Sequence, residues 1–493
     1  MLNTFILSIG LFATSPTDSA NKPVSVHPIH HELENIVNHP FLEGANVSLH
    51  VLDFEKDKVL YSHNPDESLI PASTIKLFTT AAALFYLGSE YRFMTRIFGS
   101  PPNGNTIESD IYLQSDGDPW LVPERIWYLA NRLRYLGVRE IKGDIYVDNS
   151  YFSGPMHASG VEQDLTSNAY MSPAGAVSVG FNAVHVHIRP ATKLNEPATI
   201  EIEPTSSYLN IQGEILTQDS ESTNLKVDIV PTGDKATVVV SGKLNVADGP
   251  LGYWRRIPHS ALHAGAVLKD LLTQTGVRVH GNVKVGHRPE AVPILVEMES
   301  PRLAELITKV NQYSNNFMAS QLARAVGAIR YGIPGTWDKG KKSIHDFLTK
   351  EVGITTTFSI ENASGLHDVN RVSTRQVTRL LQFMLKKPEL KTEYLASLSI
   401  AGQNGTLSTR MEEGRANKRL RGKTGTLKIA SALSGIVFDH KNRPFLFSFL
   451  VNNYRRSIQD IWQVQDNLGN VLATQEPDKE KPSSPLGIRS KEP

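Results

Sequence analysis

The sequence predicts an α+β fold in which one discontinuous domain is interrupted by a long β-rich insertion. Its 493 residues exceed the ~250–300 over which a single hydrophobic core grows, so two or three domains are expected. Helical patterns occur early in the chain and again after residue 300, whereas short alternating strands dominate residues 96–286. Because a long insertion survives only at a surface loop whose ends lie close together, residues 24–96 and 291–474 are expected to form one domain.

The first part of this domain is expected to begin with a hairpin and continue into a helix. Residues 47–61 are predicted to form two strands joined by a turn at residues 55–58. A helix is expected from Ser73 to Leu87, because Pro71 precedes it and Gly88 provides a stop signal.

The insertion is predicted from β-branched alternation between Gly, Pro and Asn turns, which is clearest at residues 143–148, 184–188 and 236–240. After the insertion, helical periodicity returns and two strands precede a last helix. The helices are expected at 301–310, 315–326, 341–351, 374–385 and about 457–474, and the strands at 431–438 and 444–452.

The two ends of the chain differ from the rest in composition. The apolar run Phe5–Ala13 is too short to span a bilayer as a helix and resembles the apolar region of a signal peptide. We therefore expect residues 1–23 to form a signal segment. Since no Lys or Arg precedes the run, a truncated signal or a plain N-terminal arm is the alternative. Residues 475–493 are rich in Pro, Lys, Glu and Ser, which predicts a disordered tail.

Charge and cysteine content exclude several classes of function. Lys plus Arg is 51 and Asp plus Glu is 50, a balance unlike the basic excess of a dedicated nucleic-acid binder. Without cysteine the chain can form no disulfide, thiolate metal site or cysteine nucleophile. Residues 335–341 nearly match a phosphate loop, but Lys342 stands where Ser or Thr is needed. His185 and His187 share a strand face without an evident third ligand, so we expect neither a metal nor an organic cofactor.

The S-x-x-K motif at residues 73–76 is the first of three motifs that together predict a nucleophilic site. Ser73 and Lys76 are three residues apart and share a face of the first helical turn. At a helix start, unpaired N–H groups and the helix dipole favour the alkoxide that Ser73 would become. Apolar neighbours and a second cation would lower the pKa of Lys76 toward that of a general base. Taken alone, the motif also fits an N-capping serine and a solvated lysine.

The second motif, S-x-N at residues 314–316, is expected to begin another helix, and a helix N-cap is the alternative role for its serine. Ser314 would relay a proton between Lys76 and the leaving nitrogen of a substrate. Asn316 would hydrogen-bond the substrate amide and the Lys76 ammonium.

The third motif, K-T-G at residues 423–425, occurs once and precedes a β-prone stretch, which places it on a strand that lines a cleft. Gly425 would let the substrate backbone approach closely. Lys423 and Thr424 would bind a carboxylate, and the Thr426 N–H would be an oxyanion donor beside that of Ser73. An exposed turn is the alternative, but the order of the three motifs favours the site of a serine acyl-transferase.

The chain resembles the D-Ala-D-Ala carboxypeptidases of the penicillin-binding protein 4 type, the S13 serine peptidases. The resemblance covers most of the chain. Its segments are 69–76, 117–121, 143–148, 170–173 with Asn182, 362–366, 402–407 and 423–427. The sequence departs from the family pattern at Asn362, Ala363, His367 and Asn404, none of which belongs to the three motifs.

This resemblance implies a penicillin-recognition domain like that of serine β-lactamases, with an antiparallel sheet between helices, interrupted by nested β-rich domains. The catalytic domain is then expected at residues 24–96 and 291–474. Inserted domain II is expected at residues 97–173 and 246–290, and nested domain III at residues 174–245.

The resemblance also implies a serine-type D-Ala-D-Ala carboxypeptidase, with DD-endopeptidase action on cross-links, that uses an acyl-enzyme on Ser73 and is inhibited by penicillins. The expected partners are peptidoglycan stem peptides and β-lactams, without nucleic acid and with at most peripheral membrane association. The expected location is extracytoplasmic, in the periplasm. Two alternatives stay open: a β-lactamase or esterase with the same motifs, and a non-catalytic cell-wall binding protein.

Overall fold

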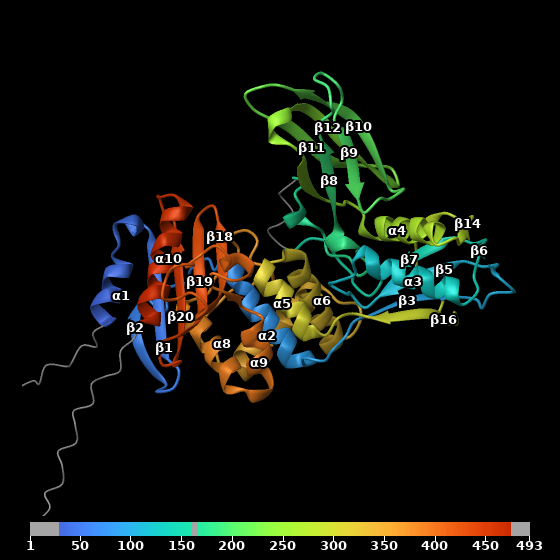
Figure 1. Ribbon diagram of the computed structural model, residues 1–493. Helices are drawn as coiled ribbons and strands as arrows, with labels where there is room; N and C mark the ends of the chain where they lie inside the picture. The colour runs from blue at the N-terminus through green and yellow to red at the C-terminus, as the bar shows by residue number, and fades with distance from the viewer. Residues whose placement is uncertain (1–28, 159–165, 475–493) are drawn as a thin grey trace, which may run out of the picture.

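The computed structural model describes residues 29–158 and 166–474 of the chain. Two large parts lie side by side, and a third, made of β-strands, projects from one of them (Figure 1). The expected signal segment at residues 1–23 and the expected disordered tail at residues 475–493 lie outside the described residues. Among the described helices, none has both the length and the apolar character that crossing a membrane requires.

A six-stranded antiparallel sheet organises the part that contains both ends of the described chain. Its strand order is β17-β18-β19-β20-β1-β2. Within the sheet, β1 (Asn46–Asp53) from the start of the chain pairs with β20 (Pro444–Asn452) from the end. The other strands are β2 (Lys58–His63), β17 (Ser399–Ile400), β18 (Leu420–Leu427) and β19 (Ala430–Phe438). The sheet therefore joins segments from either side of the insertion.

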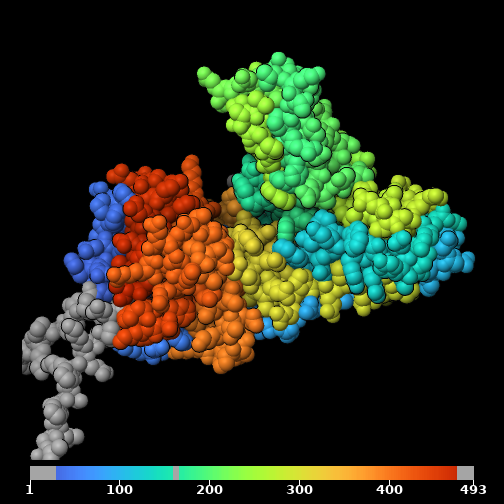
Figure 2. Space-filling model, in the orientation of Figure 1, coloured from blue at the N-terminus to red at the C-terminus, as the bar shows by residue number. Residues whose placement is uncertain are grey.

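Helices cover both faces of this sheet, which confirms the predicted α+β class (Figure 1). In the space-filling view, the part made of β-strands (green) stands out from the rest of the molecule (Figure 2). On one face, α1 (Ile29–Val37) and α10 (Ile458–Ala473) enclose an apolar core. On the other face, α2 (Lys76–Leu87) lies at the centre of a larger core. The helices around α2 are α5 (Leu303–Tyr313), α6 (Asn316–Tyr331), α7 (Trp337–Asp346), α8 (Thr374–Lys386) and α9 (Pro388–Ala396).

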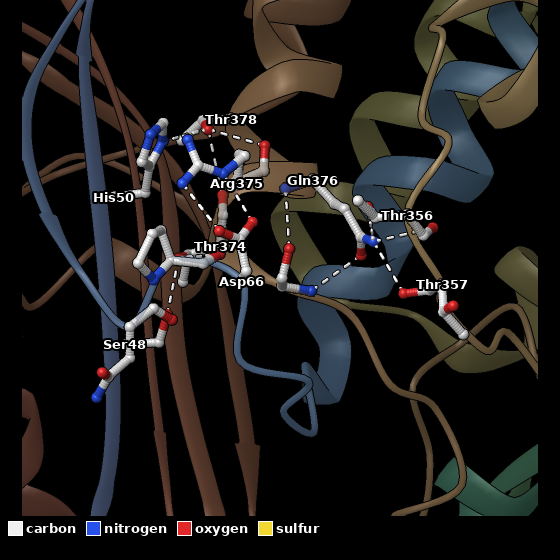
Figure 3. Close-up of polar contacts among 12 residues, drawn as sticks. Ser48, His50, Asp66, Thr356, Thr357, Thr374, Arg375, Gln376 and Thr378 are labelled. Carbon is white, nitrogen blue, oxygen red and sulfur yellow. Dashed lines mark hydrogen bonds and ion pairs between the residues drawn. The ribbon is translucent and has the colours of Figure 1, made fainter.

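Buried polar contacts fix α8 on the sheet (Figure 3). The hydroxyl oxygens of Ser48 on β1 and Thr374 on α8 are 2.7 Å apart. One turn further along, His50 Nδ1 lies 2.7 Å from Thr378 Oγ1. Burial lowers the pKa of His50 to about 4, so its imidazole is neutral at pH 7. Hydrogen bonds thus add to the apolar packing that holds this helix against the sheet.

The insertion contains a five-stranded sheet with the strand order β15-β7-β5-β3-β16. Its strands are β3 (Met94–Gly99), β5 (Ile111–Ser115), β7 (Ile145–Asp148), β15 (Val283–Val285) and β16 (Ile294–Glu299). A small sheet beside it holds β4 (Thr106–Ile107), β6 (Glu140–Ile141) and β14 (Arg278–Val279). Because β16 pairs with β3, residues 294–299 belong to this sheet. We propose that the second segment of the main domain begins after residue 299, whereas residue 291 was expected.

Two helices of the insertion were not predicted. The helices α3 (Pro123–Tyr135) and α4 (Ser260–Gln274) contribute to one core with the five-stranded sheet. Pro123 stands in the first turn of α3, which is a helix-start signal that the surrounding strand-like texture obscured. The part of the insertion that contains the five-stranded sheet is therefore a mixed α and β structure. Only the part that projects from it is β-rich.

The projecting part consists of two three-stranded sheets, β10-β12-β11 and β13-β8-β9, around a shared core. Its strands are β8 (Ala183–Arg189), β9 (Thr199–Glu203), β10 (Leu209–Gln218), β11 (Asn224–Thr232), β12 (Lys235–Asn245) and β13 (Leu251–Arg256). Since β13 pairs with β8, these sheets extend beyond residue 245, the expected end of the nested domain. We propose residue 256 as that end.

Candidate active site

Ser73 lies in a tight turn that leads directly into α2. The sequence predicted an α-helix from Ser73, but residues Ala72–Ile75 form a 3-10 turn, and α2 begins at Lys76. The difference arises at Ala72, whose φ of 46° turns the chain sharply just after Pro71. Lys76 Nζ is 2.9 Å from Ser73 Oγ, so the structure brings the predicted pair into hydrogen-bond contact.

Gly365 allows this turn to form. The φ of Gly365 is +77°, and a Cβ on it would lie 1.9 Å from the carbonyl oxygen of Ala72. A side chain at position 365 would therefore collide with the backbone next to Ser73. Residues 362–366 thus support the turn that carries the serine.

Lys76 is fully buried and held by three oxygen atoms. Besides Ser73 Oγ, its ammonium donates to Asn316 Oδ1 at 2.7 Å and to the carbonyl oxygen of Ser364. Among the described residues, no carboxylate forms an ion pair with Lys76. Burial, and next the charge of Lys423, hold the pKa of Lys76 well below its ordinary value. A neutral amine beside a serine hydroxyl can act as a general base.

Lys423 and Ser314 form a second hydrogen-bonded pair next to the first. Lys423 Nζ donates to Ser314 Oγ at 2.9 Å and to the carbonyl oxygen of Thr424 at 2.8 Å. Burial lowers the pKa of Lys423 to about 7. Ser314 itself follows the C-terminus of α5 in a left-handed conformation, with φ 56°. It does not cap α6, as the alternative interpretation required; Asn315 does so by accepting from the N–H of Met318.

The K-T-G motif lies on a strand, β18, as predicted, and this strand runs past the serine turn. A Cβ on Gly425 would lie 2.8 Å from the carbonyl oxygen of Pro71 and 3.0 Å from the nitrogen of Ser73. The strand can therefore approach the turn only because residue 425 is glycine. Thr424 Oγ1 donates to Thr406 Oγ1 at 2.7 Å, and Thr426 is exposed.

Three further contributors to the site were not predicted from sequence. They are the Ser364 carbonyl at Lys76, Thr406 at Thr424, and the carbonyl oxygen of Tyr170, which accepts from Asn316 Nδ2 at 3.2 Å. Each belongs to a segment that carried the S13 resemblance. However, two of the three act through backbone carbonyls, which no residue type identifies.

The fold and this site define a class of protein, the active-site serine enzymes of the penicillin-recognising fold, in which a serine and lysine lie at one helix start and a K-T-G strand runs beside them. Residues 29–475 match the D-Ala-D-Ala carboxypeptidase 3 (S13) family. The chain belongs to this serine-type peptidase family, which confirms the resemblance drawn from the motifs.

Relatives of known structure and function share this organisation. The chain is 30% identical to the D-alanyl-D-alanine carboxypeptidase of Actinomadura sp. strain R39 over 447 residues, covering 88% of this chain and 82% of that protein. It is similar to the crystal structure of penicillin binding protein 4 (dacB) from Haemophilus influenzae, with a TM-score of 0.79, 25% identity and coverage of 90% of this chain and 99% of that one. A structure of the same protein with a β-lactam gives a TM-score of 0.74 at 23% identity, covering 90% of this chain and 100% of that one.

Proposed function

We propose that this protein is a D-Ala-D-Ala carboxypeptidase that cleaves peptidoglycan stem peptides through an acyl-enzyme on Ser73. The observation that carries the proposal is the contact of Ser73 Oγ with the buried Lys76 amine. In the first step, Ser73 Oγ attacks the carbonyl carbon of the penultimate D-Ala while Lys76 takes the serine proton. The C–N bond to the terminal D-Ala then breaks, and water later hydrolyses the ester on Ser73.

The leaving amine needs a proton when the C–N bond breaks. The position of Ser314 supports a role as the proton relay. Its hydroxyl lies 2.9 Å from Lys423 Nζ. Asn316, two residues later, contacts Lys76. A proton taken by Lys76 can pass through the Ser314 hydroxyl to the departing nitrogen. Asn316 would orient the substrate amide at the same time.

Recognition of the terminal carboxylate is assigned to β18. Lys423 supplies a positive charge at and below its pKa of about 7, and the Thr424 hydroxyl, half-buried at the strand, supplies a hydrogen-bond donor. The N–H groups of Ser73 and Thr426 are proposed as the oxyanion donors, each of which typically contributes ~10²–10³ in rate. The glycine at position 425 supports the assignment of these oxyanion donors, because the absence of a side chain there allows β18 to lie against the serine turn.

The substrate class follows from the family and the relatives. A D-alanyl-D-alanine carboxypeptidase releases the terminal D-Ala from a D-Ala-D-Ala terminus. This terminus occurs in peptidoglycan, which supports a location outside the cytoplasm, in the periplasm. The H. influenzae structure in complex with a β-lactam supports β-lactams as ligands of this site. The β-lactamase and the non-catalytic alternatives are not favoured, since the matching relatives are carboxypeptidases.

The test is covalent labelling together with product analysis. Ser73→Ala should abolish both labelling by a fluorescent penicillin and release of D-Ala from a D-Ala-D-Ala peptide. The exposed Ser408→Ala serves as a matched control that should retain both. Mass analysis of products from cross-linked fragments then separates carboxypeptidase from endopeptidase cleavage. Retained labelling of a folded Ser73→Ala variant would contradict the assignment.

A further inference from the structure

Two histidines and a glutamate converge on one face of the sheet β13-β8-β9, in the projecting part of the molecule (Figure 1). His185 and His187 alternate along β8 and so share a face. Glu203 on the neighbouring strand β9 lies directly opposite His185 in the antiparallel register. The sequence alone shows no third ligand for the histidine pair, but the pairing of β8 with β9 supplies Glu203, which is sixteen residues from His187.

The polar atoms of these side chains are close enough to share one ion. One nitrogen from each histidine and one carboxylate oxygen of Glu203 all lie within 4.8 Å of one another. His187 Nε2 is 2.9 Å from Glu203 Oε2, and the centroids of the two imidazole rings are 4.0 Å apart. A metal ion could therefore replace the proton between His187 and Glu203 and still reach His185 with small side-chain movements.

The ring of His185 is held in place by its surroundings on β13. Trp254 stacks on it, with ring centroids 4.6 Å apart and planes inclined by 12°. Gly252, one position along the same face, leaves the space that the imidazole occupies, since a Cβ there would lie 2.1 Å from His185 Nε2. Stacking fixes the plane of the ring. One ligand of the cluster is thus positioned in advance.

We infer that His185, His187 and Glu203 form a Zn²⁺ site with a fourth position open to water. Two imidazole nitrogens and a carboxylate oxygen are ligands that Zn²⁺ commonly takes, at about 2.0–2.2 Å. The hard cations Mg²⁺ and Ca²⁺ prefer sets made of oxygen alone. The bound ion would link β8 to β9.

Calorimetric titration of the untagged full chain with ZnCl₂ tests this site. The wild-type protein should bind one Zn²⁺ per chain at these residues. His187→Ala and Glu203→Gln should each lower the affinity for Zn²⁺ at least about tenfold, a change typical of weakened metal coordination. Because Zn²⁺ binds the folded state, it should also raise the melting temperature of the wild type and not that of His187→Ala.

His280→Ala is the matched control. His280 Nε2 contacts Glu140 Oε1 at 2.7 Å, which is a similar exposed pair, but it belongs to none of the three-ligand groups among the described residues. This variant should keep wild-type affinity for Zn²⁺. The inference is overturned if the wild type binds no stoichiometric Zn²⁺, or if His187→Ala and Glu203→Gln retain wild-type affinity. Circular dichroism without metal establishes that each variant is folded before titration.

Discussion

Lys76 and Lys423 are both fully buried, and neither has an acidic partner among the described residues. Desolvation disfavours the charged form of each lysine, and the charge of Lys423 further lowers the pKa of Lys76. Two such groups titrate together, so the pair is expected to lose its protons in two separate steps. The state with Lys76 neutral and Lys423 charged provides both the base and the carboxylate anchor.

The pH dependence of kcat/KM should therefore be bell-shaped for a D-Ala-D-Ala peptide. At low pH, protonation of Lys76 removes the base. As the pH rises through about 7, Lys423 loses its positive charge and the free enzyme binds the terminal carboxylate less well. The measurement is kcat/KM for D-Ala release between pH 5 and pH 10.

A peptide with an amidated C-terminus is the control for this prediction. It carries no carboxylate, so its acylation of Ser73 should keep the acidic limb and lose the alkaline one. If the amidated peptide shows the same decline at high pH, Lys423 does not act through the carboxylate, and its role in recognition must be reassigned.

At the scale of elements, the approach of β18 to the serine turn depends on one missing side chain. Gly425→Ala places a Cβ 2.8 Å from the Pro71 oxygen and 3.0 Å from the Ser73 nitrogen, closer than real Cβ contacts. The strand or the turn must then shift by a few tenths of an ångström. Because misplaced oxyanion donors commonly cost ~10²–10³ in rate, we expect acylation by a fluorescent penicillin to slow at least about tenfold.

Gly422→Ala, on the same strand, is the control. The nearest atoms to its Cβ, Leu420 Cδ2 and the Ser434 oxygen, would be 3.2 Å away, and neither belongs to the site. Both variants should have similar melting temperatures, whereas only Gly425→Ala should label slowly. Equal labelling rates for the two variants would show that β18 does not need its close approach to the turn.

Elements with clear end signals were predicted well from the sequence. The helix at residues 374–386 begins after Ser373 with a capping box, and the strand at residues 444–452 has the predicted bounds. The predicted helix bounds on either side of Ser314 were wrong. Ser314 has a left-handed backbone between two helices, and only a glycine at such a position would have marked the helix end in the sequence. Helix α7 ends at Asp346, and a π-helical turn occupies the rest of the predicted helix at residues 341–351.

At the scale of the whole molecule, the sequence predicted which residues share the candidate active site. It did not predict the contacts that hold them in place. The order of the three motifs indicated that Ser73, Lys76 and Lys423 share a site, although the insertion separates the first two from the third. In contrast, the convergence of His185 with Glu203 depends on strand register, which a single sequence does not determine.

One buried arginine joins the insertion to the main domain. Arg324 on α6 is 2% exposed and donates to the carbonyl oxygens of Ala174 at 2.6 Å and Ser153 at 2.8 Å, both in the insertion. Its guanidinium also lies 4.6 Å from the ring centroid of Phe152 and 5.0 Å from that of Trp337. Burial lowers the pKa of Arg324 to about 10, so it stays charged at neutral pH.

Arg324→Met should destabilise the protein and loosen the insertion. The methionine keeps much of the apolar stem but leaves the Ala174 and Ser153 carbonyls without their donor, at a cost of about 1–3 kcal/mol for each. We expect a loss of at least about 2 kcal/mol in the free energy of unfolding by urea. Because Asn316 contacts the Tyr170 carbonyl from the insertion, penicillin labelling should slow as well.

Arg330→Met, on the same helix, is the control. It shows how much of the loss of stability comes from removing any arginine from α6 rather than from releasing the insertion. Its guanidinium lies 3.7 Å from the ring centroid of Tyr86 and stays within the main domain. Both variants lose one charge and two ring contacts, but only Arg324→Met removes donors that reach the insertion. Limited proteolysis should therefore cut the insertion faster in Arg324→Met than in Arg330→Met. Equal cleavage rates, or equal losses of stability, would mean that the insertion is held to the main domain by its apolar contacts instead.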